Sequence, residues 1–120
     1  MGAQEQEVYD QAGIPIFGPK GGQMAYGAVT GNSKFMVVDG QKQNSYDIIG
    51  TPVFSPEGGH LAYVAGMGDT RFVVIDGKNG GAYDFIFNSS QGGIYFDSAN
   101  SFHYLAVRGD KIYLVEEKLQ

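Results

Sequence analysis

Few residues of this chain are suited to acid–base or nucleophilic chemistry. The candidates are both histidines and four of the serines: His60, His103, Ser55, Ser89, Ser90 and Ser101. A hydrolytic triad needs a serine, a histidine and an acid in a recognisable arrangement, and none of these serines lies in a Gly-x-Ser-x-Gly motif. We therefore predict no catalytic residues and no enzymatic activity for this chain. His60 is expected to be a solvated turn residue, and His103 a packed or edge histidine within a strand.

The sequence also does not indicate a metal or cofactor site. A metal site needs several converging ligands, and the two histidines have no cysteine or spaced carboxylate beside them. The glycine pairs at 21–22, 58–59 and 80–81 precede no predicted helix, so turns are favoured over a phosphate-binding loop. We expect no cofactor and no bound metal. A cation site at the repeated carboxylates is the minor alternative, because calcium needs about six oxygen ligands and no Asp-rich loop supplies them.

Charge and hydropathy narrow the range of partners. Thirteen acidic and eight basic residues give a formal net charge of −5, the wrong sign for binding a phosphate backbone, so nucleic acid is not expected as a partner. No apolar run approaches the roughly 18 residues of a membrane span, so membrane insertion is not expected either. The chain has no cysteine, which leaves its redox compartment open.

The sequence contains an internal repeat, and the elements of this repeat must position the residues named above. The stretch FSPEGGHLAY at 54–63 matches FGPKGGQMAY at 17–26 without a gap, at a shift of 37 residues. A shorter relative, FDSANSFHY, follows at 96–104. A Tyr-Asp pair recurs with the same spacing, at residues 9–10, 46–47 and 83–84. We divide the chain into an N-terminal tail at 1–8 and a repeat domain at 9–120, with repeats of about 9–45, 46–82 and 83–120.

Each repeat contains the pattern of four short antiparallel strands. The extended pieces are 13–17, 50–54 and 93–96; the second strands are 24–29, 61–65 and 102–107; the third strands are 35–38, 72–75 and 112–115. A more polar fourth strand lies around Tyr46 or Tyr83. Four strands in a unit of roughly 40 residues are typical of a β-propeller blade. The sequence therefore predicts an all-β fold of about three four-stranded antiparallel blades, with a β-sandwich as runner-up.

The predicted core consists of large aromatic residues that recur in the repeat. We expect burial of Phe17, Tyr26, Phe35, Phe54, Tyr63, Phe72, Phe96 and Tyr104. The tyrosine of each Tyr-Asp pair is expected to pack on the next blade while the carboxylate accepts hydrogen bonds. Asp39 and Asp76, each followed by glycine, are expected to be hairpin-turn residues whose side chains bond nearby amides.

Several blocks of the sequence resemble a known repeat family. They are PVFSPEG at 52–58, LAYVA at 61–65, VVIDGK at 73–78 and AYD at 82–84. These blocks are similar to WD40-like PD40 repeats, which occur in TolB-type propellers and in propellers of prolyl-oligopeptidase-type peptidases. The resemblance implies a propeller of six or more blades that is a non-catalytic scaffold for protein contacts, in a periplasmic or secreted setting. The alternative is a fragment of a longer propeller that supports or gates a peptidase or hydrolase domain outside this chain.

The loops on one side of the blades are the expected surface for a protein partner, because loops on a rigid scaffold commonly carry function. The candidate contact residues lie between the second and third strands and in the long loop near residue 90: Lys34, Asp69, Arg71, Asn88, Gln91, Arg108, Asp110 and Lys111.

The strand count predicts how the chain assembles. Tyr9 and Asp10 read as a displaced outer strand, and the third repeat stops before a fourth strand. Three blades cannot close a ring, because packed sheets differ in direction by only about 30°. We therefore expect a homodimer of six blades, in which the strand at residues 7–11 of each copy completes the third blade of the other. The alternatives are a fragment of a longer propeller and an assembly with another ring size.

Overall fold

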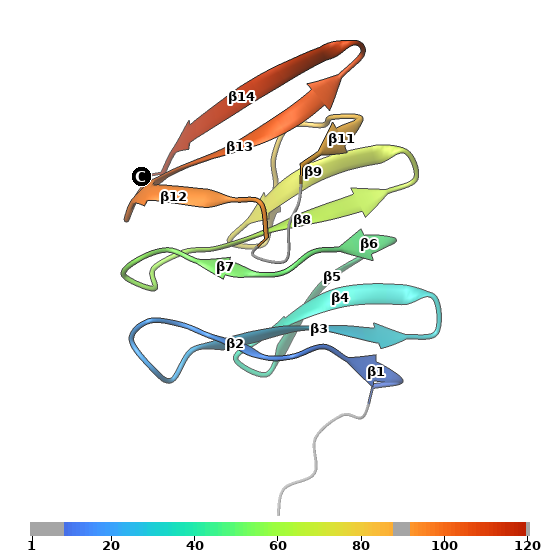
Figure 1. Ribbon diagram of the computed structural model, residues 1–120. Helices are drawn as coiled ribbons and strands as arrows, with labels where there is room; N and C mark the ends of the chain where they lie inside the picture. Colours follow the sequence, from blue (N-terminus) through green and yellow to red (C-terminus); the bar gives the residue numbers. More distant parts are fainter. Residues whose placement is uncertain (1–8, 88–91, 120) are drawn as a thin grey trace, which may run out of the picture.

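The computed structural model describes residues 9–87 and 92–119, and all of its regular structure is β. Three antiparallel sheets follow one another along the chain and stack face to face, as Figure 1 shows from blue through green to red. We call these sheets blades 1, 2 and 3. The predicted all-β fold of blade-like antiparallel sheets is confirmed.

The strands have the following bounds. Blade 1 contains β1 (Gln11–Ala12), β2 (Ile16–Phe17), β3 (Met24–Thr30), β4 (Ser33–Val38) and β5 (Gln41–Tyr46). Blade 2 contains β6 (Ile48–Ile49), β7 (Val53–Phe54), β8 (Leu61–Met67), β9 (Thr70–Ile75) and β10 (Lys78–Asn79). Blade 3 contains β11 (Phe85–Ile86), β12 (Tyr95–Ser98), β13 (Ser101–Arg108) and β14 (Lys111–Lys118).

The innermost strand of blades 1 and 2 is interrupted. Strands β1 and β2 both pair with β3, and β6 and β7 both pair with β8. Between the two short pieces the chain contains Pro15 or Pro52, which cannot donate a ladder hydrogen bond. The extended segments expected at 13–17 and 50–54 therefore form only two-residue strands at their ends.

The Asp-Gly hairpins follow the predicted turn chemistry. Asp39 and Gly40 have φ values of 50° and 84°, and Asp76 and Gly77 have 51° and 82°. Two successive residues with positive φ are characteristic of the type I′ turn, whose twist matches that of the flanking strands. The Asp39 carboxylate accepts a hydrogen bond from Met24 N at 2.8 Å, so the predicted role of this aspartate is confirmed.

The core lies between the blades. One apolar cluster joins blade 1 to blade 2, and a second joins blade 2 to blade 3. Strand β8 is buried on both faces, because blade 2 has a neighbour on each side. In β13 buried and accessible residues alternate, because blade 3 has one neighbour. Blade 1 has buried residues on both faces: Met36 faces blade 2, while Phe35 and Val37 belong to a separate cluster on the opposite face. We call the face of a blade directed toward the next blade in chain order its forward face, and the opposite face its backward face.

The predicted aromatic core is largely present, with one error. Phe35, Tyr63, Phe72 and Tyr104 are buried, while Tyr26, Phe54 and Phe96 are half-buried. Phe17 is 69% exposed, so its predicted burial is wrong. Its repeat equivalents Phe54 and Phe96 pack on the clusters between blades, whereas Phe17 lies on the backward face of blade 1, where the described residues provide no further blade.

The interpretation of Tyr9 and Asp10 as an outer strand is also corrected. Asp10 N donates to Val29 O at 2.8 Å, and Gln11 pairs with Val29 inside blade 1. The outer strand is instead the segment before the Tyr-Asp pair, as in β5, which ends at Tyr46. Gln11 therefore cannot serve the third blade of another copy in the way expected for residues 7–11; residues 7 and 8 lie outside the described residues.

The pairing of β13 with β14 shifts the third strand of the third repeat by one residue relative to the alignment expected from the sequence. Ile112 pairs with Val107 as Lys34 pairs with Val29, so Tyr113 takes the place of Phe35. An aromatic residue therefore occupies this position of the third strand in all three blades, although Tyr113 is 38% exposed, and Glu117 takes the place of Asp39.

Tyr63 offers a direct test of the core between blades 1 and 2. Its ring is buried and its hydroxyl donates to Gln43 Oε1 at 2.7 Å. Tyr63→Ala should lower the free energy of unfolding by about 3–5 kcal/mol through loss of packing. Tyr63→Phe keeps the ring and should cost only about 0.5–1.5 kcal/mol. Urea denaturation measures both values, and equal losses in the two variants would contradict this packing.

The buried tyrosines also predict a pH dependence. Burial, reinforced by Tyr46, raises the pKa of Tyr63; burial, followed by the nearby Tyr83 and Glu117, raises the pKa of Tyr104. Because ionisation is disfavoured in the folded state, the stabilisation is complete below the ordinary pKa of 10.0 and is lost as pH rises above it. Thermal unfolding should therefore show a falling Tm above about pH 10, with a smaller fall in Tyr63→Phe. A Tm that does not change over this interval would argue against the shift.

Candidate interaction surfaces

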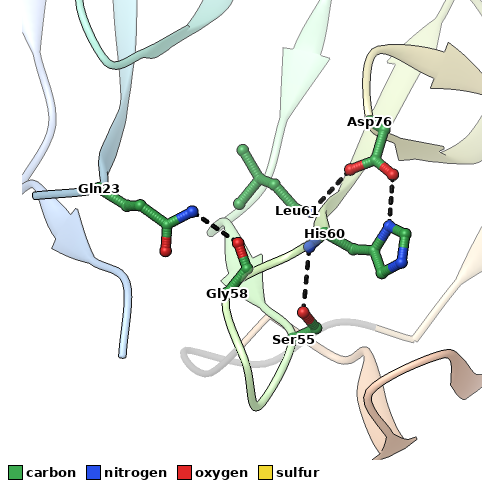
Figure 2. A network of polar contacts seen from close by, with 6 residues as sticks. All are labelled: Gln23, Ser55, Gly58, His60, Leu61 and Asp76. Atoms are coloured by element: carbon green, nitrogen blue, oxygen red, sulfur yellow. Dashed lines mark hydrogen bonds and ion pairs between the residues drawn. The ribbon is translucent and has the colours of Figure 1, made fainter. Parts of the chain in front are cut away.

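Ser55, His60 and Asp76 lie close together at the turn before β8, as Figure 2 shows, but their geometry is structural. The Ser55 hydroxyl accepts a hydrogen bond from the backbone N of His60 at 3.0 Å and does not contact the imidazole. The imidazole Nδ1 lies 2.6 Å from Asp76 Oδ2, and Asp76 Oδ1 accepts from Leu61 N at 3.0 Å. A nucleophile and base are therefore not paired here. These contacts hold the turn against the end of β9.

His60 is not the solvated turn residue that the sequence predicts. Its side chain is only 19% exposed and pairs with Asp76, whose carboxylate contacts both the ring and the backbone of β8. At the same position in blade 1, Gln23 crosses to the neighbouring turn, where its Nε2 donates to Gly58 O at 2.5 Å (Figure 2). The two turns of blades 1 and 2 are thus joined by a side chain.

His103 matches the expected packed histidine of a strand. Its ring stacks on Tyr95 with 5.5 Å between centroids, and its Nδ1 lies 2.8 Å from Asp97 Oδ1. Within residues 9–87 and 92–119, no three His, Asp or Glu side chains come together in a way that could hold a metal ion.

The Tyr-Asp pair forms a corner that is repeated in all three blades. The carboxylates of Asp10, Asp47 and Asp84 each accept a hydrogen bond of 2.7 Å from a turn glycine, namely Gly31, Gly68 and Gly109. The corner thereby fastens the start of each innermost strand to the turn between the second and third strands. The predicted structural role of these aspartates is confirmed.

The tyrosines of the corner pack on the backward face of the blade that they precede. Tyr46 contacts Tyr63 and Phe72 edge to face, with centroid distances of 6.5 and 5.5 Å. Tyr46 ends the outer strand of blade 1, so its ring ties one blade to the next. The predicted packing of the ring on the next blade is therefore confirmed for Tyr46.

The eight predicted partner-contact residues divide into three groups: four exposed residues, two residues outside the described part of the chain, and two arginines. Lys34, Asp69, Asp110 and Lys111 are exposed, at or next to turns that lie at the same end of the three sheets in Figure 1. Asn88 and Gln91 lie outside the described residues.

The two arginines of that prediction have local partners. Arg71 Nη1 donates to Gly68 O at 3.0 Å and to Thr70 O at 3.1 Å. Arg108 Nη2 donates to Ala82 O at 2.8 Å, and its guanidinium lies 4.3 Å from the centre of the Tyr83 ring. Arg71 is half-buried and Arg108 exposed, and both side chains brace the turns through these contacts.

An exposed apolar surface on the forward face of blade 3 was missed by the sequence analysis. Alternation along β13 and β14 places Leu105, Val107, Ile112 and Leu114 on this face, with Leu105 opposite Leu114 and Val107 opposite Ile112. Leu114 is 59% exposed and Ile112 66% exposed. Phe85 pairs with Val107 and extends the same surface.

The repeat explains why this exposure is unusual. Leu114 occupies the position of Met36 in blade 1 and Val73 in blade 2, which are 0% and 1% exposed because the next blade covers them. The alternation of apolar residues was a sequence signal for this surface, but it could not indicate which face lacks a cover.

The backward face of blade 1 is the other end surface. Tyr9 contacts Tyr26 and Phe35 edge to face, with centroid distances of 6.5 and 5.3 Å. Blade 2 has the same arrangement in Tyr46, Tyr63 and Phe72, and there it is covered by the forward face of blade 1. The exposed Phe17 pairs with Met24 and lies on the same face of blade 1 as Tyr26.

Comparison with known proteins adds no relative. The chain matches no protein-family model, and no curated protein or solved structure is similar to it. The resemblance to WD40-like PD40 repeats therefore stays a prediction. In the part of the chain that the structure describes, no helix has the length and apolar character needed to cross a membrane.

The corner aspartates can be tested within one turn. Asp47→Ala removes the carboxylate that accepts from Gly68 N, and we expect a loss of about 1–2 kcal/mol in the free energy of unfolding. Asp69→Ala changes an exposed aspartate of the same turn and should stay within about 0.5 kcal/mol of the unmodified chain. Chemical denaturation measures the free energy of unfolding of both variants. Similar losses in Asp47→Ala and Asp69→Ala would contradict the stabilising role of the Asp47 carboxylate.

Proposed function

We propose that this chain is a non-catalytic β-propeller scaffold for protein–protein interaction, and that two copies join into a six-bladed ring. The observation that supports this most strongly is the match between its two end faces. The backward face of blade 1 has the aromatic arrangement that blade 2 buries under its neighbour. The forward face of blade 3 presents Leu114 where the other blades have a buried residue.

Burial of apolar surface supplies the driving force for this assembly. Each apolar side chain that leaves water contributes roughly 1.5–3 kcal/mol, and large contiguous apolar patches on monomers usually mark interaction sites. Phe85, Leu105, Ile112 and Leu114 form such a patch on blade 3. The chemistry of the patch fits an apolar, aromatic surface better than a charged ligand.

Geometry favours a second copy as the cover. Figure 1 presents blades 1 and 3 at opposite ends of an open stack, so one copy does not bring its own end faces together. Three blades would have to turn by about 120° each to close, far from the roughly 30° offset of packed sheets. Six blades need half that turn, and a two-fold axis pairs each blade 3 with the blade 1 of the partner.

In such a ring the turns between second and third strands lie together on one rim. Lys34, Asp69, Asp110 and Lys111 are exposed there on short, braced turns. A rigid rim with side chains of both signs is suited to contact with another protein, since complementary charges give specificity. We propose this rim as the surface for the scaffold's protein partner.

A charge placed on the end face tests the ring. Light scattering after size exclusion should give about twice the 12.9 kDa of one chain. Leu114→Asp should give the mass of one chain with an unchanged far-ultraviolet circular dichroism spectrum, because an unpaired charge is costly in an apolar interface. Ile14→Asp changes a residue that is 84% exposed outside the end faces, and should keep the larger mass. A single-chain mass for the unmodified protein, or a dimer of Leu114→Asp, would refute the ring.

A further inference from the structure

Strand β14 has an open edge. In blade 1 the third strand β4 pairs with the fourth strand β5, and in blade 2 β9 pairs with β10. In blade 3, β14 pairs with β13 along its full length, and no described residue pairs with its other side. An eight-residue edge strand with unpaired N–H and C=O groups is a template for an additional strand.

The chain contains a second segment that resembles the missing strand. In β5, glutamines stand at 41 and 43 and a tyrosine at 46; the same spacing occurs as Gln4, Gln6 and Tyr9. The shift is the 37 residues of the repeat. Because Tyr9 packs on blade 1 as Tyr46 packs on blade 2, residues 4–8 correspond to the outer strand of a blade behind blade 1.

The contacts of β5 explain why this pattern is useful. Gln43 Oε1 accepts from the hydroxyl of Tyr63 at 2.7 Å, and the hydroxyl of Tyr46 donates to Asn79 Oδ1 at 2.8 Å. Both are contacts from the outer strand of blade 1 to blade 2. An outer strand with this spacing therefore joins its own blade to the next one. Gln6 and Tyr26 each lie 37 residues before Gln43 and Tyr63. They are therefore the equivalent pair for a contact between blade 1 and a blade behind it.

We propose that residues 4–8 of one copy add to the open edge of β14 in the second copy and complete its blade 3. This inference rests on the proposed ring and specifies the partner segment that it needs. The register follows from β4 and β5, where Val38 pairs with Gln41 and Phe35 with Ser45. It places Gln4 opposite Glu116 and Val8 opposite Tyr113.

Strand addition and face packing support each other in this arrangement. The added strand contributes main-chain hydrogen bonds along β14, as in other cases of β-strand addition. Because residues 4–8 lead directly to Tyr9, the same connection brings the backward face of blade 1 against the exposed Leu105 and Leu114. In this arrangement the strand from the second copy both pairs with the open edge of β14 and positions that copy against blade 3.

The absence of cysteine from the chain allows a clean crosslinking test. A copy with Gln4→Cys is mixed with a copy carrying Glu116→Cys and oxidised mildly, and linked peptides are identified by mass spectrometry. The control replaces Glu116→Cys by Val115→Cys, which points to the other face of β14. We expect about tenfold more mixed disulfide with position 116 than with position 115, since a disulfide needs Cα atoms within about 7 Å.

Light scattering of the same mixtures separates this inference from the proposed ring. A dimer mass without the preferred 4–116 disulfide, or with equal linkage at 115 and 116, would overturn strand addition and leave the ring standing. Single-chain mass without a disulfide would overturn both. A preferred 4–116 disulfide together with dimer mass supports the register.

Discussion

The structure depends on the burial of one blade's aromatic backward face under the forward face of its neighbour. This contact is made twice within the chain, around Tyr63 and around Tyr104, and each time small or aliphatic residues of one sheet cover large rings of the next. In blade 3, which has one neighbouring blade, burial along β13 is one-sided and the opposite face stays exposed. In the proposed ring, the same interaction would also join the two copies.

The Tyr-Asp corner converts this packing into a fixed geometry. The carboxylate of Asp47 holds the start of β6 to the turn after β8, while the ring of Tyr46 lies in the interface behind it. The outer strand of one blade and the inner strand of the next are consecutive in sequence. The adjacent residues Tyr46 and Asp47 set the placement of these two strands, because one packs between the blades and the other bonds the turn. This limits how one blade can move against the other.

Sequence was sufficient to predict the parts of the fold that depend on local chemistry. The 37-residue repeat predicted the sheets, and the Asp-Gly pairs predicted hairpins with positive φ. It failed where burial depends on a neighbour: Phe17 has the sequence context of Phe54 but lacks its cover. Tyr9 was assigned to an outer strand because strand and corner residues are adjacent. The local contacts of Arg71 and Arg108 depend on backbone carbonyls that only the folded turns bring into reach.

The central claim is that the exposed end blades complete each other, and hydrogen exchange of β14 tests it most directly. Strands β4 and β14 occupy equivalent places, but only β4 has a paired outer strand in the described residues. The amides of β14 should become as protected as those of β4 when the protein concentration is raised, because association adds a strand to the open edge. Exchange of β14 that stays fast and independent of concentration would contradict the account.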